Sequence, residues 1–529
     1  MAEERTHRKH WGALRAPLRT TLYLLAITGA ASSKPPHLIS IFADDLGWYD
    51  TALYNEHAPT PAIAALANDG LLLERHYVFR YCSPSRRSFL SGRFPTSITS
   101  VQPDGDRLCS DFLPLATTTL AEKLRDGAGY ECHFFGKGHL GYETTDHLPI
   151  NRGFASHVGF LSGSEHYSHG LLHGDNSSDL WLDREPALAL APVLDSATTY
   201  YAGRAVDAVE AHAADGPPLF MYVAFQNVHT PYEMPPEDER GAWPDFPLCA
   251  DCVYAQMLHA LDLGVDRVAK ALKTTNKWDD ALLLFTADNG GVGEFGNNRP
   301  LRGHKHDPWE GGTRAAAFLA GGRLPARLRG ARTGAKFVHV ADWFCGLAGV
   351  DAADDVVFDG VVRGVDGVDV WPLLTGANTT QPRPVTPVTE VSVVDAASPD
   401  RWWKLVTLAG QSVRYAANAT QTPAESACLA GRQPDPPQPG RTDPVVTGDD
   451  CPVCNATAPC LFDVLGDAEE KHNVAAQHPD VVRRLAGALD DASLYYVTGS
   501  LDPALLEAKY RRIDNASWAG FQAPCYAPV

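Results

Sequence analysis

The stretch YCSPSRRSFLSGR, Tyr81–Arg93, places a lone cysteine ahead of a serine, a proline and two arginines. Ser83 is a good N-cap and the proline after it suits the first helical turn, so we expect Cys82 just before a helix N-terminus. Free backbone N–H groups and the helix dipole favour an anion there. A buried or disulfide-bonded cysteine is the ordinary interpretation, but it leaves Arg86 and Arg93 unexplained. The stretch therefore predicts an anion-binding site beside Cys82.

Two further stretches carry oxygen ligands. Asp44 and Asp45 follow the apolar run HLISIF, and Asp288 and Asn289 follow ALLLFT. Each pair alone is common in helix caps and turns. Together they supply hard oxygen ligands for one divalent cation, and the lack of His or thiolate among them favours Ca²⁺ or Mg²⁺ over zinc.

The elements that position these residues are four apolar, β-rich runs: HLISIF, YECHFF, PLFMYVAF and ALLLFT. Such continuous runs are typical of strands buried on both faces. Helical patterns lie between them at 61–70, 118–129 and 201–214, so the fold class is α/β with a mostly parallel sheet. Ligands bind beyond the carboxyl ends of such strands. The polar residues that fall there are Asp44, Asp45, Lys137, His139, His229, Asp288 and Asn289.

The chain of 529 residues is too long for one hydrophobic core. From about Pro384 the texture changes to Pro-rich and Cys-rich loops around the strand-like WWKLVTL and the helix-like HPDVVRRLAGALDDA. We expect a catalytic domain over 34–385 and a smaller α+β domain over 386–529.

The N-terminus has basic residues, then the apolar run TLYLLAITGAA, then small residues and two prolines. This order predicts a signal peptide over 1–33. The alternative, a retained membrane anchor, is disfavoured because the run is about half of the ~20 residues that a span needs. No later segment is apolar enough to span a bilayer. Five Asn-x-Ser/Thr sequons agree with a glycosylated secretory-pathway product: Asn176, Asn378, Asn418, Asn455 and Asn515.

The chain has 11 cysteines, and an odd number leaves at least one unpaired in an oxidising compartment. CADC (249–252) and CPVC (451–454) could be zinc or redox pairs, although disulfide partners are the favoured interpretation. The net charge of -19, from 45 basic and 64 acidic residues, argues against a nucleic-acid surface. An anionic substrate would need a local basic pocket.

CSPSR followed by FLSGR resembles the sulfatase signature CxPSRxxxLTGR. ADDLGW, GKGHLGY, NVHTPYEMP, TADNGG and RGHKHDPWEGGTR resemble five other motifs of that family, in the same order. The resemblance implies an alkaline-phosphatase-like fold, Ca²⁺, and oxidation of Cys82 to formylglycine by the formylglycine-generating enzyme. The other ten cysteines would allow up to five disulfides. Gly138 stands where the family usually has Trp.

The resemblance also implies roles. A hydrated aldehyde (gem-diol) at residue 82 would attack sulfur and form a covalent sulfo-enzyme. Lys305 and His229 would assist the leaving alcohol, His139 would act as the base, and Arg86 and Lys137 would hold the diol and the metal cluster. The expected substrate contacts are Lys137, His229 and Lys305. The expected metal ligands are Asp44, Asp45, the oxidised Cys82, Asp288 and Asn289. The polar histidines of the expected surface loops receive no catalytic role: His157, His166, His169 and His173.

Within the family, LPINRGFASHVGFLSGSEHYSHG reads like the arylsulfatase B (N-acetylgalactosamine-4-sulfatase) type, which implies a sulfated carbohydrate substrate and a lysosome-like or extracellular location. Two other functions stay open, a phosphodiesterase or phosphonate hydrolase of the same superfamily and a non-catalytic glycan-binding relative. GKGHLG also matches the dinucleotide pattern GxGxxG, but the polar, proline-containing residues after it do not read as a helix, which disfavours nucleotide binding.

Overall fold

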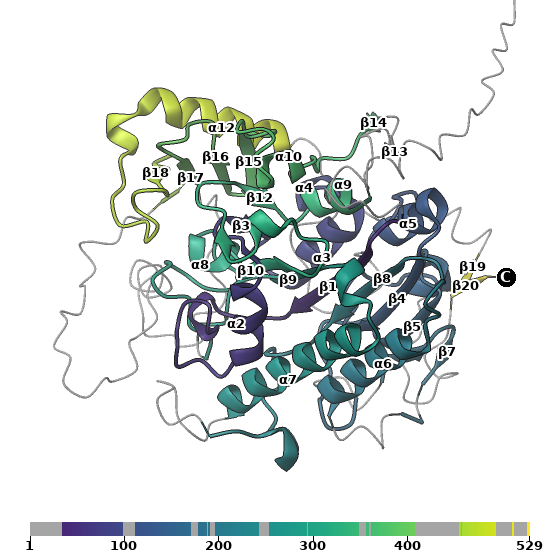
Figure 1. Ribbon diagram of the computed structural model, residues 1–529. Coiled ribbons are helices and arrows are strands. Elements are labelled where there is room, and N and C mark those ends of the chain that lie inside the picture. Colours follow the sequence, from purple (N-terminus) through teal and green to yellow (C-terminus); the bar gives the residue numbers. More distant parts are fainter. Residues whose placement is uncertain are drawn as a thin grey trace, which may run out of the picture.

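The computed structural model describes most of the chain as a layered α/β body with a smaller sheet packed on it (Figure 1). The described residues are 34–98, 112–170, 178–187, 189–190, 196–242, 253–293, 295–348, 356–358, 361–407, 454–455, 457–493, 510–512 and 526–528. The expected signal peptide at 1–33 lies outside them. Among the described helices, none has both the length and the apolar character needed to cross a membrane.

The largest sheet of the described residues has ten strands. In spatial order they are β11 (Ala331–Arg332), β2 (Leu71–Leu72), β10 (Ala317–Ala320), β9 (Ala281–Ala287), β1 (His37–Ala43), β8 (Leu219–Ala224), β4 (Glu131–Gly136), β5 (Ser156–Phe160), β6 (Leu180–Leu182) and β7 (Glu185–Pro186). The five central strands, β9 to β5, are parallel, whereas β10 and β6 run antiparallel to their neighbours.

The four apolar runs of the sequence form the centre of this sheet. They correspond to β1, β4, β8 and β9, and nearly all their residues are buried. β1 pairs with β8 and with β9 in parallel, with Ile39 opposite Met221 and Leu283. Apolar side chains on both faces require cover on both faces. The predicted α/β class with a mostly parallel core is confirmed.

Helices provide this cover (Figure 1). On one face lie α2 (Pro61–Asn68), α6 (Ala197–Ala211) and α7 (Val253–Thr274); on the other lie α3 (Cys82–Ser91), α4 (Pro95–Ile98), α5 (Leu120–Ala128) and α9 (Asp342–Ala348). The sequence explains local boundaries, as in α5, where Thr119 and Glu122 form a reciprocal capping box and Gly129 ends the helix at φ 71°. The short helices α8 (Glu310–Thr313) and α10 (Trp371–Leu374) lie in connecting segments.

A second, antiparallel sheet begins at Val385, close to the change in composition. It contains β15 (Val385–Thr389), β16 (Ser392–Asp395), β17 (Trp403–Val406) and β18 (Cys460–Asp463), and α12 (Pro479–Ser493) packs on it through Leu485 and Leu489. Trp402 and Phe462 share a buried cluster with Tyr77 and Trp309 of the larger body. The expected α+β character of this smaller unit is therefore confirmed.

Three further pairs of short strands lie outside these two sheets in the described residues. Two are hairpins, β13 (Val356–Phe358) with β14 (Val361–Arg363) and β19 (Tyr510–Arg512) with β20 (Tyr526–Pro528). In the third, β3 (His76–Tyr77) pairs with β12 (Val338–His339).

The cysteines agree with the prediction in part: Cys454 of the CPVC stretch forms a disulfide, as expected, but the number of possible disulfides is smaller than five. Cys454 is bonded to Cys460, six residues away, whereas Cys132 and Cys345 are buried free thiols. Five disulfides are therefore excluded, because only eight cysteines remain once these two thiols and Cys82 are set aside. The cysteines 249, 252 and 451 of the CADC and CPVC stretches lie outside the described residues. Of the sequons, Asn378 is exposed and Asn455 is half-buried, and the other three also lie outside.

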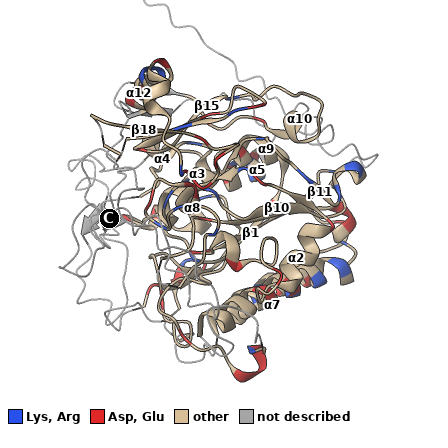
Figure 2. Ribbon diagram, turned by 90° about the vertical axis from the view of Figure 1, so that its left-hand side faces the viewer, with Lys and Arg blue, Asp and Glu red and all other residues tan. Residues whose placement is uncertain are grey.

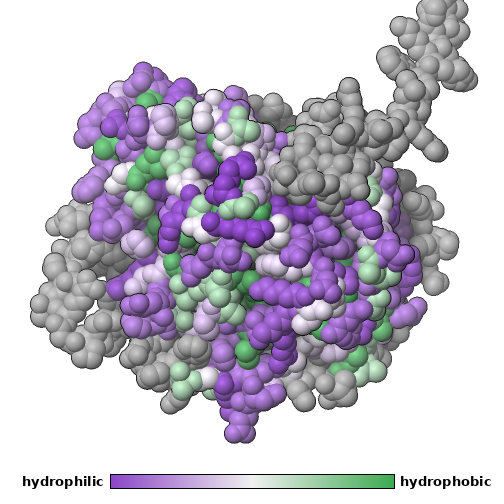
Figure 3. All heavy atoms as spheres, viewed as in Figure 1, coloured by the Kyte–Doolittle hydropathy of each residue, from purple (hydrophilic) through white to green (hydrophobic). Residues whose placement is uncertain are grey.

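The surface gives little sign of a single charged or apolar binding face. Lys and Arg are interspersed with Asp and Glu over the described elements (Figure 2). The face in Figure 3 is mainly hydrophilic with scattered hydrophobic residues. The concentrated charge lies inside, at the carboxyl edge of the large sheet.

Candidate active site

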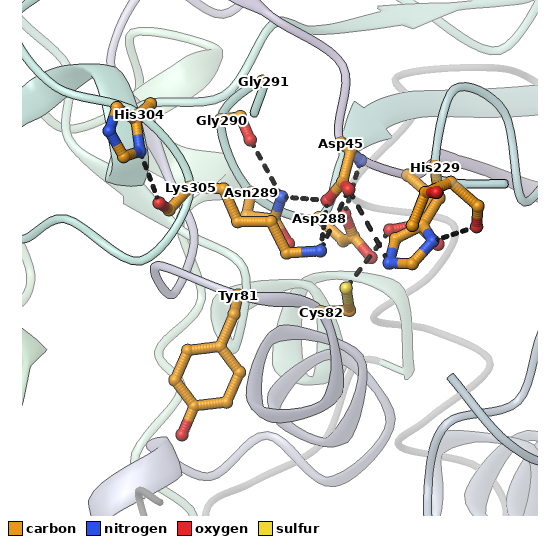
Figure 4. A network of polar contacts seen from close by, with 12 residues as sticks. Asp45, Tyr81, Cys82, His229, Asp288, Asn289, Gly290, Gly291, His304 and Lys305 are labelled. Carbon is orange, nitrogen blue, oxygen red and sulfur yellow. Dashed lines mark hydrogen bonds and ion pairs between the residues drawn. The ribbon is translucent and has the colours of Figure 1, made fainter. Parts of the chain in front are cut away.

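The carboxyl ends of four central strands deliver the predicted polar residues to one place. Asp44 and Asp45 follow β1, Lys137 follows β4, and His229 lies five residues beyond β8. His139 also follows β4, Asp288 and Asn289 follow β9, and Cys82 joins them from the start of α3 (Figure 4). The edge of a parallel sheet thus brings together residues as distant in the sequence as Asp45 and Asn289, which are 244 positions apart.

Helix α3 begins two residues earlier than predicted. Cys82 is its first residue and Tyr81, in an extended conformation, is the N-cap; Ser83 is not the cap. Ser85 provides the local hydrogen bond instead, because its Oγ accepts the Phe79 N–H at 2.8 Å. Tyr81 points away from the cluster while Cys82 points into it (Figure 4).

Three carboxylates and one amide form the candidate metal site. Asn289 Nδ2 donates to Asp45 Oδ1 at 2.8 Å, and the Asp45 N–H faces Asp288 Oδ1 at 3.4 Å. Asp44 is joined to the group through Cys82, whose Sγ lies 3.2 Å from Asp44 Oδ1. All these side chains are buried.

The donor set fits a hard divalent cation. Asn289 Oδ1 is buried and has no hydrogen-bond partner among the described residues, although its Nδ2 has two. A buried amide oxygen without a partner costs free energy, and a cation would satisfy it. Since the other donors are carboxylate oxygens, these residues suit Ca²⁺ or Mg²⁺.

Three cationic side chains balance the three carboxylates. Arg86 Nε donates to Asp288 Oδ2 at 2.7 Å, Lys137 Nζ contacts Asp44 Oδ2, and Lys305 Nζ lies 2.9 Å from Asp45 Oδ2. These three side chains form the local basic pocket that an anionic substrate would need in a protein with this acidic composition.

The pKa values of the carboxyls follow from this balance. Burial opposes the ionisation of Asp44 and Asp45, but nearby positive charges outweigh it and lower both pKa values. The main positive charge is Lys137 for Asp44 and Lys305 for Asp45. Burial and the charge of Asp44 raise the pKa of Asp288 to about 7. One carboxyl of the metal-free cluster thus binds a proton near neutral pH, and a bound cation would displace it.

The encoded thiol of Cys82 is unsuited to be a nucleophile. Burial, reinforced by the charge of Asp44, raises its pKa far above the usual range. Reactive cysteines show the opposite shift, because the thiolate is the nucleophile. A neutral thiol at this buried position is a poor nucleophile.

A network that the motifs did not predict holds Lys305 in place. Asn298 Oδ1 accepts the Gly291 N–H at 2.9 Å, while its Nδ2 donates to the carbonyls of Gly291 and Gly303. The Lys305 N–H donates to Gly291 O at 3.0 Å. Asn298 thereby ties the lysine loop to the loop after Asn289; its only signal in the sequence is the turn-forming NNRP stretch.

The two site histidines are neutral near pH 7. Burial and the charge of Lys305 lower the pKa of His229 to about 4. Its Nδ1 donates to Thr230 O at 2.6 Å, so Nε2 faces Asp45 Oδ2 at 3.7 Å without a proton. Burial and Lys137 hold the pKa of His139 well below its usual range, and its buried Nδ1 has no hydrogen-bond partner in the described structure.

Several side predictions can now be compared with the structure. Only two short 3-10 helices, Thr145–His147 and Pro149–Asn151, follow Gly136–Gly141 before β5, and the glycine turn opens no α-helix, so the pattern lacks the nucleotide-binding turn. A Cβ on Gly138 would lie 3.1 Å from Phe160 O and 3.4 Å from Leu161 Cα, so the end of β5 packs closely against this glycine, where the family usually has Trp. His157 is buried in β5, which corrects the surface-loop interpretation. Arg93 reaches Gly364 O at 2.7 Å and is structural.

The model of the sulfatase family matches residues 36–350, which is more than half of the chain. The protein belongs to the sulfatase family. This match includes every predicted site residue, from Asp44 to Lys305.

Several named sulfatases are similar in sequence to this chain. Mouse (Mus musculus) arylsulfatase J is 33% identical over 358 residues, which cover 65% of this chain and 56% of the relative. Bovine (Bos taurus) arylsulfatase A is 29% identical over 392 residues (67% and 71%), and the N-acetylgalactosamine-6-sulfatase of Canis lupus familiaris is 25% identical over 397 residues (70% and 71%). The chain thus spans just over half of arylsulfatase J. This spread of relatives does not single out the arylsulfatase B type.

Solved structures share the sulfatase fold over nearly the whole chain. Ps i-CgsB superposes with a TM-score of 0.65 at 23% identity, covering 88% of this chain and 94% of that one. The PsFucS1 sulfatase from Pseudoalteromonas sp. superposes with a TM-score of 0.60 at 19% identity, covering 92% and 95%.

Proposed function

We propose that this sulfatase hydrolyses sulfate esters of a carbohydrate, with an oxidised Cys82 and a bound Ca²⁺ at its centre. The observation that carries the proposal is the position of Cys82, buried at the first residue of α3 and 3.2 Å from Asp44 in the cluster of oxygen ligands. The raised pKa of its thiol explains why the encoded residue would need conversion to formylglycine. The formylglycine-generating enzyme is then a required partner during maturation.

Asp44, Asp45, Asp288, Asn289 and the oxidised residue 82 would hold the cation. When both groups are present, Ca²⁺ supplies positive charge to the sulfate oxygens and formylglycine supplies the nucleophilic oxygen. Three carboxylates balanced by three cations leave the charge of the metal ion in excess, so the pocket favours an anionic ester.

The residues of the chain divide the remaining work. Arg86 holds Asp288 in place by a hydrogen bond. Lys137 holds Asp44 and is placed to contact the sulfate group. Lys305 is fully charged, because Asp45 raises its pKa despite burial, and it would stabilise negative charge on the leaving oxygen. His229, with an unprotonated Nε2, would contribute only once a bound anion favours its protonation.

His139 is the candidate base. Its depressed pKa keeps the ring neutral, and the unpartnered Nδ1 is available to hold a proton. The ring lies on the side of the segment at Gly163, where a Cβ would come within 3.0 Å of His139 Cε1. This close packing would keep the imidazole in one orientation.

An aromatic pair supports a sugar as the substrate. Tyr232, three residues after His229, packs on Phe295 with ring centroids 4.4 Å apart, and Phe295 is 41% exposed. Both residues lie on loops that begin at the active-site edge of the sheet. Phe295 thus offers an exposed ring, supported by the half-buried Tyr232, that suits the apolar face of a pyranose. Two structural neighbours were solved with sugars, one with k-i-k-neocarrahexaose and one with D-glucosamine-2-N,6-O-disulfate.

A secretory location agrees with this function. The expected signal peptide, the sequons and the disulfide between Cys454 and Cys460 all fit a lysosome-like compartment or the extracellular space. The expected catalytic domain at 34–385 would carry the whole site.

The test is turnover of an aryl sulfate by wild-type protein and Cys82→Ala, each coexpressed with the maturation enzyme. Cys345→Ala is the matched control, because Cys345 is also a buried free thiol but lies in α9. We expect activity to vanish only in Cys82→Ala, and peptide mass spectrometry over 81–86 to show the aldehyde only in the active proteins. Undiminished turnover by Cys82→Ala would refute the nucleophile, and faster turnover of a phosphate diester would favour the phosphodiesterase alternative.

A further inference from the structure

A second group of metal-ligating side chains lies outside the cluster around Cys82. His166, His169 and Glu233 each offer one ligand atom, and the three atoms lie within 4.8 Å of one another. We propose that these residues, here called the His-Glu site, bind one transition-metal ion of the Zn²⁺ type. The proposal is independent of the sulfatase activity, which does not need this ion.

The two histidines share one side of a single turn. The Gly170 N–H donates to His166 O at 2.8 Å, which closes a turn of helical type. Residues three positions apart in such a turn are neighbours. The rings of His166 and His169 accordingly lie with centroids 4.5 Å apart and an interplanar angle of 32°.

The carboxylate of Glu233 is oriented by the same turn. Its Oε2 accepts the Ser168 N–H at 3.0 Å and the Ser168 hydroxyl at 2.9 Å. Its Oε1 contacts His166 Nδ1. One oxygen is thus fixed by Ser168 while the other faces the imidazoles, which is how outer partners orient metal-binding carboxylates.

The ligand types set the metal class. Two imidazole nitrogens and one carboxylate oxygen form a three-ligand set that suits Zn²⁺ and leaves a fourth position for water. The side chains of His166 and Glu233 are 29% and 20% exposed, so an ion can reach them from solvent. At the other cluster the proposed ligands Asp44, Asp45, Asp288 and Asn289 are all oxygen donors, so the two sites would prefer different cations, a hard one there and a borderline one at the His-Glu site.

The present geometry needs only small rotations to accept the ion. Ligands at about 2.0–2.1 Å from one tetrahedral zinc lie roughly 3.3 Å apart. All three ligand atoms here are already within 4.8 Å of one another. Separation of His166 Nδ1 from Glu233 Oε1 would open the space.

The His-Glu site joins two segments that flank the active site. Glu233 follows His229 by four residues, and Tyr167 donates its hydroxyl to His229 O at 2.9 Å. Gln226 and Glu165 exchange two further hydrogen bonds between the same segments. An ion bound here would cross-link the turn at 166–170 to the segment at 226–233, and the folded protein should gain stability from it.

The test is isothermal titration of tag-free, full-length protein with ZnCl₂ while Ca²⁺ is kept saturating. We expect one Zn²⁺ per chain and a rise in melting temperature. Glu233→Gln and His169→Ala should each weaken binding by roughly 10–100-fold or more. His472→Ala is the matched control, because His472 is exposed and, within the part of the chain that the structure describes, its hydrogen bond is the one that its backbone N–H donates to Asp467. The far-ultraviolet circular dichroism of each variant verifies folding.

Substitution by Co²⁺ gives a second readout, because tetrahedral Co²⁺ bound to histidine absorbs visible light strongly. The band should appear with wild-type protein and disappear in Glu233→Gln. A wild-type protein that binds no Zn²⁺, or variants that bind it as tightly as wild type, would overturn the proposal. A raised KM for a sulfated oligosaccharide in Glu233→Gln, in a protein that binds no Zn²⁺, would instead identify the three residues as sugar contacts.

Discussion

Arg86 Nε donates a hydrogen bond to Asp288 Oδ2 at 2.7 Å, and both side chains are fully buried. The guanidinium also lies 3.6 Å from Asp44 Oδ2 and donates to Lys137 O at 3.2 Å. One residue of α3 thus contacts two carboxylates and fixes the backbone after β4. The arginine four residues after Cys82 is therefore placed to support the candidate metal site.

Substitution Arg86→Gln should abolish activity and destabilise the protein, because it leaves Asp288 buried without its partner. We expect the free energy of unfolding to fall by about 3–5 kcal/mol. Urea denaturation in the presence of a chelator measures this loss. Arg125→Gln is the control, since the Arg125–Asp126 pair is exposed and is worth less than about 1 kcal/mol. Equal losses in the two variants would contradict the role of the buried pair.

Substitution Lys305→Ala should reduce kcat most for esters with poor leaving groups. Lys305 supplies positive charge beside Asp45, and an alkoxide leaving from a sugar needs that charge more than a nitrophenolate does. We expect a loss of about 10²–10³-fold on a sugar sulfate and a smaller loss on nitrophenyl sulfate, compared by steady-state kinetics. Lys123→Ala, at a half-buried lysine of α5 outside the cluster, is the control. The same loss on both substrates would place Lys305 in binding and not at the leaving oxygen.

Substitution Asn289→Leu should weaken Ca²⁺ binding while keeping the size of the side chain. It removes the buried Oδ1 that has no partner in the described protein. We expect the Kd for Ca²⁺ to rise by at least about tenfold, the smaller effect known for residues that only orient metal ligands. Calorimetric titration of chelator-treated protein measures it. Asn289→Asp is the matched variant and should keep the affinity, because it retains an oxygen at the same place; unchanged affinity in Asn289→Leu would remove Asn289 from the ligand set.

The centre of the fold was predictable from the sequence because it is encoded locally. HLISIF, YECHFF, PLFMYVAF and ALLLFT are long enough and apolar enough to be recognised as buried strands, and the residues that follow them converge at one edge. Strands such as β2 and β10 have two and four residues and form through pairing with β9 and each other, so no local pattern marks them. For the same reason the sequence did not show that His157 is buried in a strand, because β5 is short.

Contacts between distant loops were not predictable at all. The His-Glu site joins residues 67 positions apart on loops that have no periodicity. Asn298 acts on the lysine loop through backbone carbonyls, which leave no trace in side-chain patterns. The free thiols of Cys132 and Cys345 depend on burial in the core, and the number of cysteines alone could not show which ones stay unpaired.

The contact between α8 and the smaller unit should make stability depend on pH through Glu470. Lys404 Nζ lies 3.0 Å from Glu310 Oε1 and 3.0 Å from Glu470 Oε1, and Glu470 Oε2 accepts the Glu310 N–H at 2.7 Å. Burial, with the charge of Glu310, raises the pKa of Glu470 from 4.5 to about 7, although Lys404 opposes the shift.

Because the raised pKa belongs to the folded state, that state holds this proton more tightly than the unfolded chain does. The free energy of unfolding should therefore fall as the pH rises from about 4.5 to about 7. The protein would then be more stable in an acidic compartment than at neutral pH. Glu470→Gln mimics the protonated form and keeps an oxygen for the Glu310 N–H. We expect the variant to match the wild type at pH 5 and to exceed it in melting temperature at pH 7.5, as measured by calorimetry. A wild type at least as stable as Glu470→Gln at pH 7.5 would show that Glu470 is ionised in the folded protein and that Lys404 controls it.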